Sequence, residues 1–214
     1  DNAAISTGAA PLHNLPYALD GSGLTVGLWD VGSARTTHQE FAGGRVVSMD
    51  GSSSDFHATN MAGTIAASGV DPSARGMAYN TRIDSYDWED EIAEMIDRAA
   101  YSSDQLDAKI YISNHSYGVL AGWSGNRWLG DGSDQNGADH NFGQYSRFTQ
   151  EQDAIIYNSP YFLSVWSSGN DGRDNPRPGS RVNGIGDSSV TYDPAIHPLG
   201  DGLYRNGFDT IAAQ

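Results

Sequence analysis

Apolar and polar positions along the chain follow a pattern that predicts five strands. Each candidate is a short run rich in apolar residues, bounded by glycine, proline or polar turn residues. The runs cover residues 24–29, 45–47, 82–86, 109–113 and 161–166. The first and last runs are almost continuously apolar, which is typical of strands that are buried in a sheet.

Longer repeats between these runs predict helices. Residues 57–67 carry apolar and small side chains at helical spacing, so a helix here could lie close to a sheet, and Gly69 stands where a C-terminal cap is expected. A second helix is predicted at 89–100 by a clearer amphipathic set: Ile92, Met95, Ile96, Ala99 and Ala100. Thr149 and Gln152 fit a capping box and predict a third helix after them.

Composition and charge narrow the classes of function. The 214 residues suffice for one sizeable domain or two small ones, and the net charge of −15 disfavours nucleic acid and anionic membranes as partners. The same charge is compatible with bound Ca²⁺, which takes oxygen ligands. The chain has no cysteine and no apolar run long enough to cross a bilayer. It begins at Asp1 without an initiator methionine, which predicts a processed, secreted or extracellular protein.

The candidate chemistry centres on a histidine and an aspartate. His57 stands at the mouth of the first predicted helix, where its ring would be open to solvent and suited to act as a general base. Asp30 follows the run 24–29, and the carboxyl ends of parallel strands are where sites form in open α/β sheets. The alternatives are a capping or filler histidine and a solvated turn aspartate. A nucleotide site at this strand end would need a glycine fingerprint, which residues 31–35 do not supply.

The motifs around these residues resemble those of the subtilisin-like serine peptidases, the subtilases. His57 to Ala67 is similar to the family's H-G-T-H-V-A-G-T motif, with Ala58 and Asn60 as departures. Residues 24–32 are similar to its aspartate motif, an apolar strand that ends in D-[ST]-G, with Val31 as the departure. Segments 38–41 and 76–78 resemble the family's H-x-[ED]-F/L and G-[MV]-A segments. The resemblance implies that Asp30 orients His57 and that His57 moves protons.

Two further segments carry the resemblance to the substrate-binding parts of the family. Residues 114–118 resemble N-x-S-x-G, which implies that the backbone of Ser116, Tyr117 and Gly118 pairs with extended substrate. His115, within this segment, is expected to pack beneath its strand. Residues 167–172 resemble [AS]-[AS]-G-N-[ED]-G, which implies that Asn170 donates to the oxyanion. Ser167, Ser168 and Gly169 would line one wall of the specificity pocket. By itself this segment also fits a simple turn.

Residues 119–147 are rich in Gly, Asn, Asp and Trp and are predicted to be a functional loop or an insertion, of which we take the insertion. Its aromatic residues Trp123, Trp128 and Tyr145 are predicted to cover one side of a substrate groove. Its acidic residues Asp131, Asp134 and Asp139 are candidate Ca²⁺ ligands, although their spacing fails the EF-hand pattern and a solvated loop is the alternative. We expect the chemistry itself to require no cofactor, and these oxygen ligands are compatible with a structural Ca²⁺.

The serine nucleophile that the resemblance implies has no counterpart in residues 1–214. The family's serine lies in G-T-S-[MA]-[AS] downstream of the asparagine, and Ser180, Ser188 and Ser189 do not match that motif. We therefore expect residues 1–214 to be the N-terminal portion of a single subtilisin-like domain, α/β and three-layered, with a mostly parallel sheet between helices on both faces. A C-terminal fragment of the same precursor, separated after Gln214, would supply the serine and complete the sheet. The predicted function is a serine endopeptidase acting on peptides or proteins. The alternative is a catalytically inactive binding or assembly module, which the departures at Val31, Ala58 and Asn60 favour.

Overall fold

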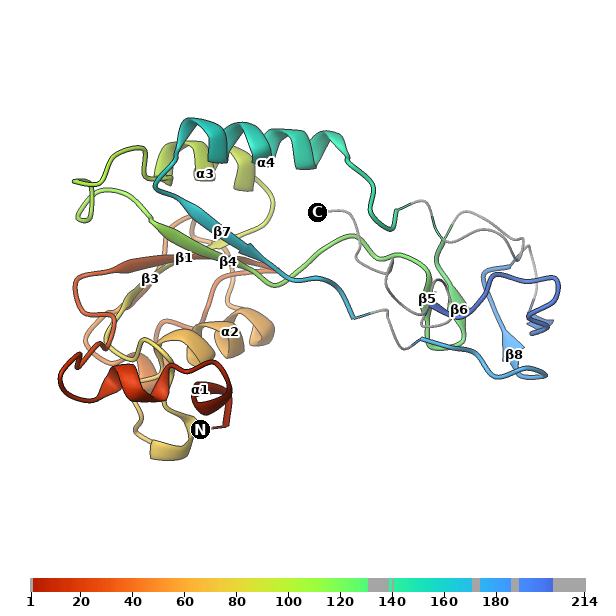
Figure 1. Cartoon of the computed structure of the whole chain (residues 1–214), viewed down its shortest axis with the longest axis horizontal. Helices are drawn as coiled ribbons and strands as arrows, with labels where there is room; N and C mark the ends of the chain where they lie inside the picture. Colours follow the sequence, from red (N-terminus) through yellow and green to blue (C-terminus); the bar gives the residue numbers. More distant parts are fainter. Residues whose placement is uncertain (1, 131–138, 140, 171–173, 186–188, 202–214) are drawn as a thin grey trace. The chain divides into compact units, whose positions relative to one another are not determined.

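The computed structural model describes residues 2–130, 139, 141–170, 174–185 and 189–201 (Figure 1). The chain divides into two compact units, and each is described by itself. The first unit comprises Asp1–Ser116 and Gln152–Trp166, and the second comprises Tyr117–Glu151 and Ser167–Gln214. Whether residues 119–147 are an insertion into a single domain stays a prediction.

The first unit is built on a five-stranded sheet in which all neighbouring strands run parallel. Its order is β2-β3-β1-β4-β7, so β1 lies at the centre. The strands are β1 (Thr25–Asp30), β2 (Val46–Ser48), β3 (Arg82–Asp87), β4 (Ile112–His115) and β7 (Leu163–Trp166). The sequence predicted all five, and the largest error is at β4, which begins three residues later than expected.

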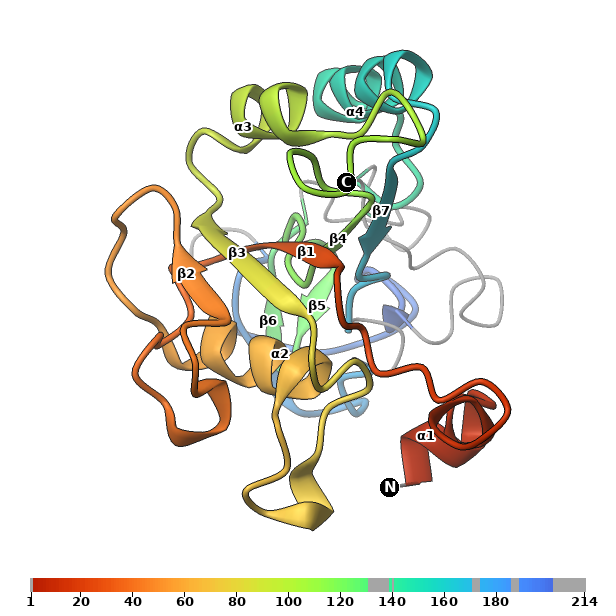
Figure 2. The ribbon, with the colours of Figure 1, turned by 90° about the vertical axis from the view of Figure 1, so that its left-hand side faces the viewer.

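Helices cover both faces of this sheet, which confirms the three-layer α/β prediction. Helix α2 (Phe56–Ala66) lies on one face, and α3 (Glu91–Arg98) and α4 (Arg147–Asn158) lie on the other (Figures 1 and 2). The shorter elements are α1 (Asn2–Ser6) and the 3₁₀ turns η1 (Ala10–His13), η2 (Gln39–Phe41) and η3 (Pro72–Ala74). Within the described part of the chain, no helix combines the length and apolarity needed to cross a membrane.

The core under α2 explains the small residues of that helix. Ala62 and Ala66 are fully buried against Leu28, Phe41 and Ile83. Short side chains let the helix backbone approach the sheet closely, so the predicted packing is confirmed. The predicted cap is wrong in detail. The helix ends at Ala66 with Ala67 as its C-cap, and Gly69 lies beyond the cap with φ of +88°.

Glu40 anchors the segment that follows α2. Its buried carboxylate accepts hydrogen bonds from the backbone amides of Gly69, Val70 and Asp71 at 2.7–3.0 Å and from the Ser68 hydroxyl at 3.2 Å. The amide of Asp71 and its neighbours hold the pKa of Glu40 below the usual glutamate value. The segment 38–41, noted above only for its resemblance, therefore has a clear structural role.

Two helix predictions need correction. Ile96 was expected in the core face of α3 but is exposed, whereas Met95, Ala99 and Ala100 are buried as expected. Helix α4 begins two residues before the predicted capping box. The cap is formed by Ser146 and Thr149, since the amide of Thr149 donates to the Ser146 hydroxyl at 3.1 Å and the amide of Ser146 donates to the Thr149 hydroxyl at 3.3 Å.

Strand β7 forms an edge of the sheet, although the sequence predicted a buried strand. The side chains of Leu163 and Val165 are 59% and 45% exposed. Through the strand register they share the α2 side of the sheet with Leu28, which packs under α2. Together with the exposed Ile112 of β4, they form an exposed apolar strip, called below the β4–β7 strip.

The second unit has its own small core. It contains two antiparallel pairs, β5 (Trp123–Ser124) with β6 (Arg127–Trp128) and β8 (Arg181–Val182) with β9 (Val190–Thr191). Trp123 and Trp128 are buried together with Val182, Ile185 and Tyr192. The prediction that the two tryptophans form the wall of a groove is therefore wrong, because they pack into this core. Tyr145 is exposed.

Candidate active site

Strand β1 delivers Asp30 at its carboxyl end. The side chain is only 1% exposed, and Oδ1 accepts a hydrogen bond from the backbone amide of Val31 at 2.8 Å. Since β1 is held between β3 and β4 by parallel pairing, the carboxylate has little freedom to move.

Helix α2 delivers His57 from its first turn. The carboxylate of Asp55 caps the helix and accepts the backbone N–H of His57 at 2.6 Å. The imidazole Nδ1 lies 2.7 and 2.9 Å from the two carboxylate oxygens of Asp30. A carboxylate at this distance favours the tautomer that carries its proton on Nδ1, which leaves the Nε2 lone pair available as a base.

The reactive side of the histidine is open. The His57 side chain is 45% exposed, and within the described residues its ring makes no hydrogen bond other than those to Asp30. Nε2 is therefore free to accept a proton from a group that approaches from outside these residues. The arrangement is a base oriented by a buried carboxylate.

Backbone contacts hold the two residues together. The amide of Ser33 donates to the Ser53 carbonyl at 3.0 Å, and the amide of Asp55 donates to the Ser33 carbonyl at 2.8 Å. This joins the turn after Asp30 to the segment that leads into α2. Gly32 allows the close approach, because a Cβ there would lie 2.8 Å from the Ser53 carbonyl oxygen.

The three residues that depart from the family motifs are neighbours of Asp30 and His57 in the sequence, but their side chains form no bonds to this pair. Ala58 is fully buried, whereas Val31 and Asn60 are exposed. None of the three side chains bonds to Asp30 or His57.

A row of stacked rings crosses the sheet next to the pair. Tyr86, Trp29, His115 and Trp166 occupy one register row across β3, β1, β4 and β7. Successive ring centroids are 4.5, 5.3 and 4.0 Å apart, with interplanar angles of 10° or less. Asp30, Ser116 and Ser167 directly follow three of these residues in the sequence. The row therefore lies directly before three candidate site residues in the sequence.

His115 confirms the expectation that it packs beneath its strand, since it is fully buried. Its Nε2 lies 2.8 Å from the Ser113 hydroxyl, and its Nδ1 lies 3.8 Å from the Glu91 carboxylate. Burial lowers the pKa of His115 from 6.5 to about 3, because the charged ring would lose its hydration. The ring is therefore neutral when it stacks on Trp29 and Trp166.

This shift makes fold stability depend on pH. The unfolded histidine binds a proton below about pH 6.5 and the folded one only below about pH 3, so stability is lost as the pH falls through this window. We expect protonation of His115 in the unfolded state to lower the free energy of unfolding by up to about 1.4 kcal/mol for each unit by which the pH falls. Urea unfolding of wild type and His115→Phe at pH 7.5, 6, 5 and 4.5 measures it. The free energy of unfolding should change less steeply with pH in the variant, because it lacks the histidine that titrates. The carboxylates titrate in both proteins and cancel in the comparison, so equal slopes would contradict the assignment.

The other predicted substrate residues are divided between the units. Ser116 belongs to the first unit, where its hydroxyl accepts the Asn114 side-chain amide at 2.8 Å. The second unit holds the rest: Tyr117, Gly118, Ser167, Ser168, Gly169 and Asn170. Within it, the Ser167 hydroxyl donates to the Tyr117 carbonyl at 2.9 Å, Gly169 has φ of +83°, and Asn170 is exposed. The structure thus brings Asp30 and His57 together, while the role of Asn170 stays a prediction.

The calcium prediction falls mainly outside the described residues, since Asp131 and Asp134 lie there. Asp139 is buried, and its carboxylate accepts the amides of Gly122 at 2.8 Å and Asn141 at 3.1 Å. Across the described ranges, no three His, Cys, Asp or Glu side chains gather as a metal site. A structural Ca²⁺ and an extracellular location both stay predictions.

Comparison with known proteins decides the family. The model of the subtilase family matches residues 22–198, a stretch that contains Asp30, His57 and Asn170. The chain belongs to the subtilase family. No curated protein sequence matches this subtilase significantly.

Two solved structures are similar to this subtilase. The Clostridium perfringens CspB protease is 18% identical, with a TM-score of 0.51, over 78% of this subtilase and 40% of that chain. The S41 psychrophilic protease is 20% identical, with a TM-score of 0.46, over 80% of this subtilase and 53% of that chain. This subtilase therefore spans about half or less of the length of these proteases.

Sequence reasoning missed two features of the site. The stacked row was not predicted, although an aromatic residue or histidine ends several of the predicted strands. Its signal would have been the alignment of Trp29, Tyr86 and Trp166 with His115 at the strand ends. The tie between Ser33 and residues 53–55 left no signal in the sequence, because it is made by backbone groups.

Proposed function

We propose that this subtilase is the N-terminal portion of a serine endopeptidase that hydrolyses peptide bonds with an Asp-His-Ser triad. The observation that carries the proposal is the Asp30–His57 pair, with Nδ1 2.7 Å from a buried carboxylate and Nε2 open. Family membership supports the same reaction. The chain order of aspartate and then histidine is the order in subtilisin.

Each residue has a defined role in the proposed reaction. His57 Nε2 takes the proton from the serine hydroxyl as it attacks the carbonyl, and later gives it to the leaving amine. Asp30 holds the ring orientation and stabilises the imidazolium that forms. Asn170 donates its side-chain amide to the oxyanion of the tetrahedral intermediate. The backbone of residues 116–118 pairs with the extended substrate, and Ser167, Ser168 and Gly169 line the pocket for the residue before the scissile bond.

The nucleophilic serine comes from a C-terminal fragment of the same precursor in this proposal. Support comes from His57, whose ring makes no hydrogen bond to a serine of the described residues. The β4–β7 strip gives further support, because an exposed apolar strip beside an edge strand is a surface that another polypeptide segment would cover.

A catalytically inactive binding or assembly module is the second candidate. The departures at Val31, Ala58 and Asn60 favour it. The intact hydrogen bonds between Asp30 and His57 favour the peptidase, because a module without chemistry has no need of an open, oriented base.

Labelling with a fluorophosphonate separates the two candidates. The full protein, with every polypeptide that copurifies, is treated with the probe and analysed by mass spectrometry. We expect one labelled serine outside residues 1–214, and no labelling of a His57→Ala variant, since the base that activates the serine is gone. A folded protein that takes no label supports the binding module, and a labelled serine within residues 1–214 contradicts the divided triad.

A further inference from the structure

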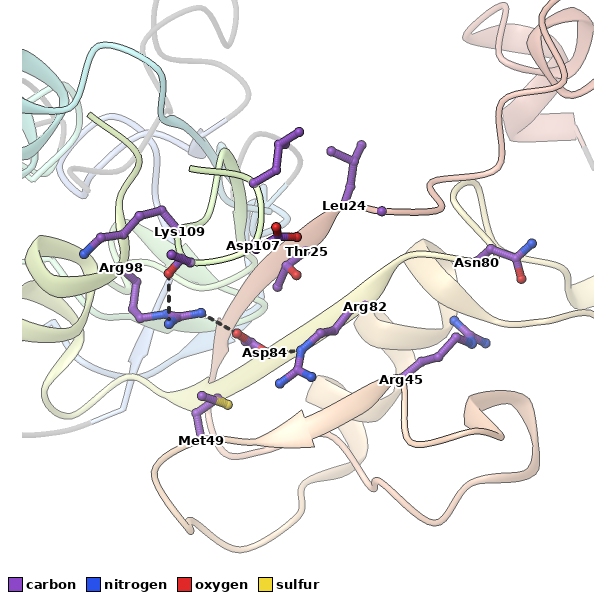
Figure 3. A pocket seen from close by; sticks show the side chains of 13 residues that line it. Leu24, Thr25, Arg45, Met49, Asn80, Arg82, Asp84, Arg98, Asp107 and Lys109 are labelled. Atoms are coloured by element: carbon purple, nitrogen blue, oxygen red, sulfur yellow. Dashed lines mark hydrogen bonds and ion pairs between the residues drawn. The ribbon is translucent and has the colours of Figure 1, made fainter. Parts of the chain in front are cut away.

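A cavity of about 450 Å³ lies beside strands β1 and β3 of the sheet (Figure 3). Its lining includes Thr25 and Arg82, the first residues of β1 and β3, whereas Asp30 is the last residue of β1. All of its lining belongs to the first unit. The cavity is therefore separate from the candidate active site.

The cavity gathers basic side chains in a strongly acidic chain. Its lining contains two carboxylates, Asp84 and Asp107, and four basic residues: Arg45, Arg82, Arg98 and Lys109. The whole chain has only 12 Lys and Arg against 27 Asp and Glu, so a third of its basic residues meet here. The lining carries a formal excess of two positive charges, whereas the chain carries −15.

Asp84 cannot neutralise its two arginine partners. Its buried carboxylate lies between them, with Oδ1 2.7 Å from Arg82 Nε and Oδ2 2.6 Å from Arg98 Nη2. Figure 3 shows the two guanidinium groups approaching this carboxylate from different sides. One negative charge shared by two guanidinium groups leaves one positive charge uncompensated.

The remaining charges of the lining are not cancelled either. Arg45 donates to three backbone carbonyls at 2.9–3.0 Å, which fix its position but carry no net charge. The Lys109 ammonium donates to the carbonyl of Asp97. Asp107 is exposed and forms no ion pair within the described part of the chain.

Arg82 offers free donors to the cavity. Its side chain is 48% exposed, and among the described residues only its Nε has a hydrogen-bond partner. Both terminal nitrogens are therefore available. The planar guanidinium group matches the geometry of an oxyanion and can bind two of its oxygens at once.

We propose that this cavity binds a small, multiply charged oxyanion of the phosphate type. Arg82 makes the direct contact through its terminal nitrogens, and Arg45, Arg98 and Lys109 supply the surrounding positive field. A small ion fits better than a polyanion, because the net charge of −15 repels an extended negative chain. Bound anion would stabilise the folded chain without competing with a peptide at His57.

Titration calorimetry with inorganic phosphate tests the site at pH 7.5, with sodium chloride used to keep the ionic strength constant. We expect saturable binding that Arg82→Gln weakens about tenfold, equal to about 1.4 kcal/mol. Arg82→Lys should weaken binding less than Arg82→Gln does, because lysine keeps the positive charge but cannot bind two oxygens through a planar guanidinium group. Arg147→Gln is the matched control, since Arg147 is highly exposed, does not line the cavity, and should leave binding unchanged.

Thermal unfolding in the same buffers gives the second measurement. Phosphate also stabilises proteins in general, because it is excluded from their surfaces. A bound ion should raise the Tm of wild type and Arg147→Gln more than that of Arg82→Gln. Should Arg82→Gln fail to fold, Lys109→Gln replaces it and should weaken binding severalfold. Equal Tm shifts in all variants, or no saturable heat with wild type, would overturn the proposal.

Discussion

If the proposed protease is assayed together with its proposed serine-bearing fragment, Asp30→Asn should lower kcat about 10⁴-fold, the size of loss known when the triad aspartate of a serine protease is disabled. Asparagine has nearly the same volume as aspartate, so the buried position at the end of β1 stays filled. Its amide group, however, can donate to Nδ1 of His57, which lies 2.7 Å from the Asp30 carboxylate. The proton of the ring then moves to Nε2, where it blocks the base. Steady-state hydrolysis of a chromogenic peptide measures the loss, and KM should change little.

Two controls sharpen this result. Asp97→Asn, at an exposed position on α3, should leave kcat unchanged. In a His57→Ala background, Asp30→Asn should lower kcat little further. Asp30 acts through the His57 ring, so the two losses of kcat are not additive. A kcat of Asp30→Asn within tenfold of wild type would show that the pair is not the catalytic base of this subtilase.

Asn170→Ala should lower kcat by about 10²- to 10³-fold, the usual effect of deleting one oxyanion donor. The charge on the oxygen develops only in the transition state, so the binding of substrate, and with it KM, should hardly change. Asn170 is exposed at the end of a segment that follows β7, so alanine there should not disturb a core. Peptide hydrolysis by the proposed protease, assayed with its proposed fragment, gives kcat and KM separately.

The matched control for this variant is Asn60→Ala. Asn60 is also an exposed asparagine, it stands at a position where the chain departs from the family motif, and its side chain makes no hydrogen bond to Asp30 or His57. We expect its kcat to equal that of wild type. Equal kcat values for Asn170→Ala and wild type would remove Asn170 from the mechanism and leave the oxyanion to other donors.

Several features of the site could be predicted from local sequence. A short apolar run that ends in Asp30 places a carboxylate at a strand end, and His57 in the first turn of a helix is open at its ring. Both positions depend on residues within one element, and the structure places the two side chains 2.7 Å apart. The packing of His115 followed from its place in β4 in the same way.

Other features depended on which element lies opposite. The periodicity of α3 predicted that Ile96 faces the core, but the core does not extend over that part of the helix, so Ile96 is exposed. The sequence predicted that Trp123 covers a substrate groove and that the run around Leu163 is a buried strand. Trp123 is buried because a second small core forms around it, and Leu163 is exposed because β7 is an edge strand.

By itself, then, the sequence determined the five strands of the parallel sheet, the helices α2, α3 and α4, and the strand-end and helix-start positions of Asp30 and His57. Hydrophobic periodicity and capping act between neighbours in the chain, so these features can be found in one segment. Only the tertiary structure decided the stacking of Trp29, His115 and Trp166, the edge position of β7 and the basic cavity. Each of these arises where segments distant in the sequence meet, and a pattern along one segment shows which side is apolar but not what packs against it.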